Sequence, residues 1–80
     1  MASKLDLLPW LENALRTLGG RGKIPQICEK IWEAHETDLR SSGDLFYTWQ
    51  YDVRWAANQL RQNKVMKANE TSPKGLWELA

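Results

Sequence analysis

The sequence contains little cysteine and no long hydrophobic run, and each of these gaps excludes a class of protein. Its eighty residues include one cysteine, Cys28, so no disulfide bond can form within the chain. A single thiol suits a reducing compartment, and we expect a cytoplasmic protein. No apolar stretch approaches the roughly twenty residues that a membrane-spanning helix needs, and the first eight residues lack the apolar core of a signal peptide. We therefore expect no membrane partner.

The sequence is also poor in the side chains that metal and catalytic sites require. His35 is its one histidine, and no second cysteine accompanies Cys28, so the ligands of a zinc site are missing. The glycines at positions 19–22 are not followed by the lysine and hydroxyl residue of a phosphate-binding loop. We expect no catalytic residue, no metal, no cofactor and no small-molecule substrate, and hence not an enzyme.

Charge is nearly balanced, with 11 basic and 10 acidic residues and a formal net charge of +1. A freely acting DNA-binding domain is usually more basic than this. The location of charge matters more than its sum, however. Six of the ten acidic residues precede residue 44, which leaves the C-terminal part with four acidic residues against five basic ones. Those basic residues are Arg54, Arg61, Lys64, Lys67 and Lys74.

Apolar residues recur every three or four positions in three segments, which is the spacing of one face of an α-helix. The predicted helices span residues 6–18, 25–39 and 45–63. Asp6 is the expected N-cap of the first helix, and Asp44 or a neighbouring serine is that of the third. Glycines end the first helix and proline starts the second. The third helix should bury Phe46, Trp49, Val53, Ala56, Ala57 and Leu60. The first two should bury Leu8, Leu11, Leu15, Leu18, Ile27, Ile31 and Ala34.

After residue 63 the period changes to the alternation typical of β-strands. Segments 65–68 and 76–79 alternate, a polar loop at 69–75 joins them, and a short extended stretch precedes the second helix at 22–24. This order predicts an α+β fold of the winged helix-turn-helix type. It comprises three helices with a small antiparallel sheet of three strands, two of which form a C-terminal wing hairpin. Residues 1–80 then make a single domain.

The third predicted helix presents a polar and aromatic face once its apolar stripe is subtracted. Amide and guanidinium groups are the side chains that read adenine and guanine edges in the major groove. We therefore expect this helix to enter the major groove of double-stranded DNA, with lysines of the hairpin on the phosphate backbone. The expected DNA-binding residues are Thr48, Gln50, Tyr51, Arg54, Trp55, Asn58, Lys67 and Lys74.

Two alternatives stay open from the residues alone. Trp55 either forms a stacking or methyl-binding surface with Tyr51, or it is covered by the wing or the second helix as an edge of the core. The near-zero net charge and a possible aromatic patch of Tyr47, Tyr51 and Trp55 also suit a protein-interaction or dimerisation module.

Two motifs resemble parts of a known family. The segment VRWAANQL at 53–60 with NKVM at 63–66, and the segment SPKGLWEL at 72–79, resemble the third helix and wing of the N-terminal winged-helix domain of Mrr-type restriction endonucleases. The resemblance spans nearly the whole chain. It implies the recognition module of an enzyme directed at modified, methylated DNA, whose nuclease domain is a separate part of the parent protein. Where the family has a glycine after the third helix, this chain has Asn63 and Lys64, and asparagine tolerates the left-handed conformation.

Overall fold

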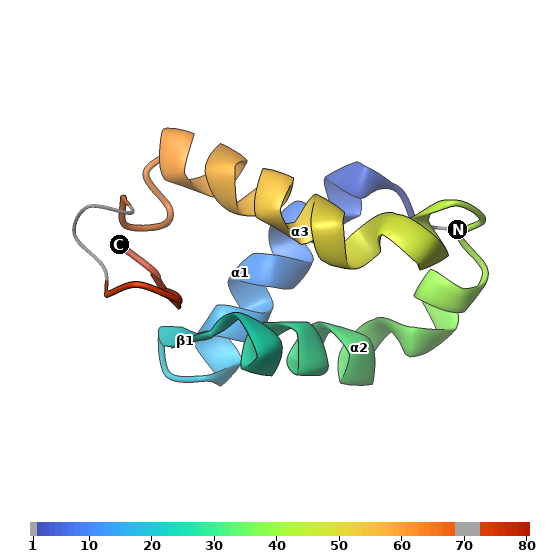
Figure 1. Ribbon diagram of the computed structural model, residues 1–80, viewed down its shortest axis with the longest axis horizontal. Coiled ribbons are helices and arrows are strands. Elements are labelled where there is room, and N and C mark those ends of the chain that lie inside the picture. The colour runs from blue at the N-terminus through green and yellow to red at the C-terminus, as the bar shows by residue number, and fades with distance from the viewer. Residues whose placement is uncertain (1, 69–72) are drawn as a thin grey trace.

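Three helices and a short two-stranded antiparallel sheet make up the computed structural model, which describes residues 2–68 and 73–80 (Figure 1). Figure 1 shows α2 and α3 running in opposite directions, with α1 crossing behind them. Within the described part, no helix has both the length and the apolar character needed to cross a membrane. The elements are a 3₁₀ turn η1 (Lys4–Asp6), α1 (Leu7–Thr17), β1 (Arg21–Lys23), α2 (Ile24–Arg40), α3 (Leu45–Gln62) and β2 (Leu76–Glu78).

The first helix begins differently from the prediction. Asp6 makes no side-chain cap to α1. Its carboxylate instead accepts the Ser3 N–H at 2.8 Å, which adds the 3₁₀ turn η1 ahead of the helix. The buried stripe of α1 is accordingly shifted to Leu7, Leu11, Ala14 and Leu15, while Leu8 and Leu18 are half-buried.

The second helix is kinked at His35, whose φ of −131° and ψ of 19° are not helical. The His35 ring stacks on Trp10 of α1, with ring centroids 3.8 Å apart and planes 6° from parallel. Ile27 and Ile31 are buried as predicted, but the prediction for Ala34 is wrong, because that residue is exposed. Leu39 is buried instead, since the helix continues past the kink at a changed angle.

The third helix confirms most of the predicted stripe. Trp49, Val53 and Leu60 are buried, as are the two alanines at 56–57. Phe46 is only half-buried, and Leu45 beside it joins the core. The prediction that Asp44 caps the helix is wrong, since its side chain makes no hydrogen bond to the backbone of the first turn. The backbone N–H groups of the first turn are satisfied by the carbonyls of the preceding turn, at 3.0–3.3 Å.

The sheet pairs the predicted extended stretch before the second helix with the predicted C-terminal strand. β1 pairs with β2, and Gly22 lies opposite the buried Trp77. The predicted strand at 65–68 is wrong as a strand, because only Met66 forms an isolated bridge, to Leu79. The sheet therefore has two strands and not three. Most of the predicted loop, at 69–72, lies outside the described residues.

The turn after α3 explains why the chain leaves the helix sharply. Lys64 has a φ of 63° and is the left-handed residue, whereas Asn63 has a φ of −83°. The Val65 N–H donates to the Leu60 carbonyl at 2.8 Å, and the Lys64 N–H donates to the Arg61 carbonyl at 3.1 Å. These two bonds form a Schellman C-cap. The expectation that asparagine would adopt the left-handed conformation here is wrong by one position.

Candidate nucleic-acid interface

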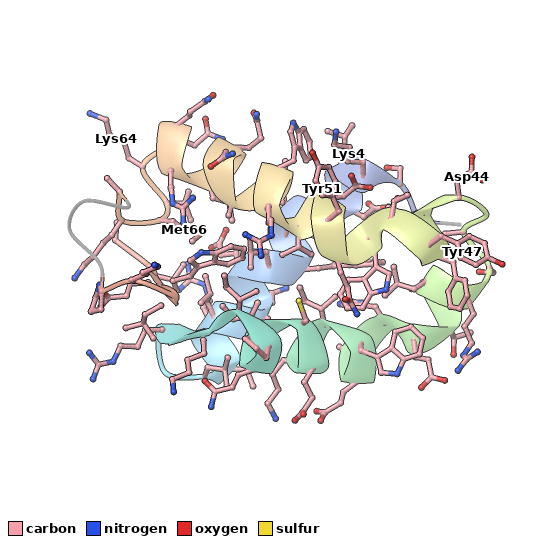
Figure 2. All side chains as sticks on the ribbon, viewed as in Figure 1. Lys4, Asp44, Tyr47, Tyr51, Lys64 and Met66 are labelled. Carbon is pink, nitrogen blue, oxygen red and sulfur yellow. The ribbon has the colours of Figure 1, made fainter. Side chains whose placement is uncertain are left out.

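The outer side of α3 is the most exposed part of the predicted recognition face. Tyr51 is 77% exposed and Tyr47, one turn earlier, is 83% exposed (Figure 2). Arg54 and Asn58 continue the same side of the helix, and both are exposed. Within the described residues, Arg54 forms no ion pair with a carboxylate. The strip therefore offers two phenols, a guanidinium and an amide to whatever lies outside it.

Two of the predicted residues lie on the flank of α3 that faces α2. Gln50 and Arg54 line a groove between the two helices, and Tyr51 stands at its edge. Each of these side chains is exposed. Three of the predicted contacts are therefore brought together along one wall.

Two other predicted residues lie on the opposite flank of α3. Thr48 donates a hydrogen bond from its hydroxyl to the Asp52 carboxylate at 2.8 Å. Trp55 is half-buried against the core, and the Lys4 ammonium lies 4.3 Å from its ring centroid. These two side chains therefore already have partners within the protein.

Trp55 is half-buried against the core, which agrees with the alternative that it forms an edge of the core. Among the described residues, the Lys4 ammonium of η1 lies over the Trp55 ring. A cation of the same chain therefore already lies over this ring. Sequence reasoning missed η1, and the one local signal for it was Ser3 three residues before Asp6, the spacing of a capping box.

The remaining predicted residues extend the site beyond the outer strip. The Asn58 amide oxygen accepts a hydrogen bond from Arg61 at 3.1 Å, so both side chains are held at the C-terminal half of α3. The Lys67 ammonium lies 3.8 Å from the Glu78 carboxylate and is 46% exposed. An exposed pair at that distance is weak, so the lysine remains available to an anion. Lys74 is exposed in the turn before β2.

The groove between α2 and α3 was not predicted. It is open and has a volume of about 900 Å³. Its lining is mainly apolar, from Ile24, Pro25, Cys28 and Trp32 of α2 and Phe46 and Trp49 of α3. The aromatic rings form a group, with the Trp32 centroid 6.1 Å from that of Trp49 and 6.3 Å from that of Phe46. The signal in the sequence was Cys28 and Trp32 beside the core stripe of α2, a second apolar face one turn wide.

The groove carries one titratable thiol. Burial raises the pKa of Cys28, and the positive charge of Arg54 partly opposes that shift by lowering it. The thiol is therefore held in its neutral form at neutral pH. In the part of the chain that the structure describes, no group of three or more histidine, cysteine or acidic residues is placed to hold a metal ion.

Comparison with known proteins returned no match of any kind: no family model, no curated protein and no solved structure is similar to this chain.

Proposed function

We propose that this chain is a double-stranded DNA-binding domain of the winged helix-turn-helix type. In this proposal α3 lies in the major groove, and the segment between α3 and β2 follows the phosphate backbone as the wing. The observation that carries the proposal is the outer strip of α3, where Tyr51, Arg54 and Asn58 are exposed on one side of the longest helix. Exposed guanidinium and amide groups on such a helix fit the donor and acceptor pattern of base edges.

The arrangement of the C-terminal part supports the wing. The Schellman turn at Lys64 directs the chain away from the helix axis, and Met66 then returns to bridge Leu79 beside β2. Figure 2 places Lys64 at the end of α3. Lys67 and Lys74 lie on either side of the same connection, where ammonium groups suit phosphate oxygens.

A preference for methylated DNA, and a place in a restriction enzyme with a separate nuclease domain, are the further part of this proposal. They rest on the resemblance of segments 53–60 and 72–79 to Mrr-type recognition domains. The half-buried position of Trp55 moves any methyl contact away from that ring and toward Tyr51.

The test is the affinity for a duplex measured against salt concentration. Binding that depends on phosphate contacts weakens linearly on a log–log plot as salt rises. Matched duplexes that are unmodified, adenine-methylated or cytosine-methylated then measure the preference for a modification. A domain with no affinity for any duplex at low salt would overturn the proposal, while equal affinity for all three would overturn only the part concerning methylation.

Variants separate the recognition face from the core. Arg54→Ala and Tyr51→Ala should weaken binding with little change in the melting temperature, because both side chains are exposed. Arg16→Ala is the matched control, since this arginine lies on α1 and pairs with Glu12 at 2.6 Å. Leu60→Ala should instead lower the free energy of unfolding by roughly 2–5 kcal/mol through the cavity it opens. Unfolding of the Arg54 or Tyr51 variant would show that the recognition face is misplaced.

A further inference from the structure

The groove between α2 and α3 is open to solvent on one side of the molecule. α1 packs behind the two helices, and none of the residues that line the groove comes from α1 (Figure 1). Trp32, Phe46 and Trp49 form its apolar part, and the Arg40 guanidinium lies over two of these rings, 5.1 Å from the Trp32 centroid.

The two walls of the groove carry opposite charges. Glu29 stands on the α2 wall and Arg54 on the α3 wall. Both side chains are exposed, and in the described part of the chain neither forms an ion pair. Arg54 is close enough to influence the pKa of Cys28, which lies beside Glu29 on α2. One carboxylate therefore stands on the α2 wall of the groove and one guanidinium on the α3 wall, with apolar surface between them.

We infer that the groove binds a second copy of this chain, in a two-fold dimer whose axis runs along the groove. A rotation about that axis exchanges the two walls, so α3 of one copy lies over α2 of the other. Arg54 then faces Glu29 of the partner subunit, and the same pair forms a second time. The groove is complementary to itself, because the exchange brings each charge opposite its counterion.

The direction of the helices is also compatible with this arrangement. α2 and α3 run in opposite directions (Figure 1), and a rotation about an axis along the groove preserves each direction. Each helix therefore lies antiparallel to its neighbour in the same copy and to the helix facing it. The four helices then enclose the aromatic residues of both copies and pack as in an antiparallel four-helix bundle. Phosphate is a poor fit for this groove, because Glu29 would repel it.

The experiment is sedimentation equilibrium over a range of protein concentrations, without DNA. Wild type should show a monomer–dimer equilibrium. Glu29→Arg and Arg54→Glu should each raise the dimer Kd by about tenfold or more, since each places two pairs of like charges in contact. An equimolar mixture of the two variants should recover dimerisation as a heterodimer, and the double variant should recover it as a homodimer. Glu33→Arg is the control with the same charge change, on a residue that pairs with Lys30 and does not line the groove.

A second measurement needs no variant. Cys28 lines the groove, so its alkylation by iodoacetamide should slow as the wild-type concentration rises through the dimer Kd. A wild type that stays monomeric to millimolar concentration would overturn the inference. So would dimerisation that Glu29→Arg and Arg54→Glu leave unchanged, or a mixture of those variants that stays monomeric. Absence of a dimer would leave the DNA proposal standing, because DNA affinity is measured separately on dilute wild-type protein.

Discussion

Replacing Lys64 with glycine should stabilise the protein. Lys64 has a φ of 63°, the left-handed conformation in which a side chain with a Cβ is strained by roughly 1–2 kcal/mol. Glycine removes that strain but loses more conformational freedom on folding, which costs about 0.5–1 kcal/mol. The net gain in the free energy of unfolding is therefore up to about 1.5 kcal/mol, or a rise in melting temperature of up to about 12 °C for a domain of this size.

The reasoning depends on conformation and not on charge, so Lys64→Ala is the control. Alanine removes the ammonium group but keeps the Cβ, and its melting temperature should stay close to that of the wild type. Chemical unfolding in urea, followed by tryptophan fluorescence, checks the free energy independently. If glycine and alanine shift stability equally, or if glycine destabilises the protein, the Schellman turn at the end of α3 does not hold its left-handed residue at position 64.

Two further experiments test the packing beside β1 and the electrostatics of the groove. Gly22→Ala should lower the free energy of unfolding by about 1 kcal/mol, because the new Cβ would lie 2.7 Å from a Leu18 methyl carbon. Urea unfolding measures this loss. The double variant with Leu18→Ala should lose less free energy than the sum of the two single variants, because the clash is then relieved. Because burial raises the Cys28 pKa, the alkylation rate of the dilute native protein should reach half its maximum at a higher pH than that of a short peptide containing this cysteine. Arg54→Ala should move that midpoint higher still, since the guanidinium lowers the Cys28 pKa; an unchanged midpoint would show that Arg54 does not reach the groove.

Periodicity was sufficient to predict the three helices and most of their core. The observed α3 at Leu45–Gln62 differs from its predicted end by a single residue, and five of its six predicted core residues are buried. That success has a physical reason. The apolar stripe of a long amphipathic helix is set by 3.6 residues per turn and needs no knowledge of what covers it.

Features that depend on contacts between distant residues were not predictable from the pattern. Trp55 lies off the stripe, and its covering by Lys4 joins residues far apart in the sequence through a 3₁₀ turn that periodicity does not register. The kink at His35 was not predictable for the same reason. The His35 ring stacks on Trp10 of another helix, and that contact does not appear in the periodicity of α2. The groove was not predicted, because apolar residues that lie beside the buried stripe of a helix are expected from sequence to belong to the core as well.

Arg54 lies on the boundary between the two proposed surfaces. Tyr51 and Arg54 are three residues apart on one side of α3, and Arg54 also forms part of the groove wall. In the dimer, Glu29 of the partner subunit neutralises the charge of the Arg54 guanidinium, so Arg54 attracts a phosphate less strongly there than in the monomer. If both proposals hold, DNA binding and dimerisation are linked through this residue, and by linkage each must weaken the other by the same factor. Adding duplex to the dimer should then dissociate it in a sedimentation experiment, and a dimer that binds duplex without dissociating would show that the two are not linked through Arg54.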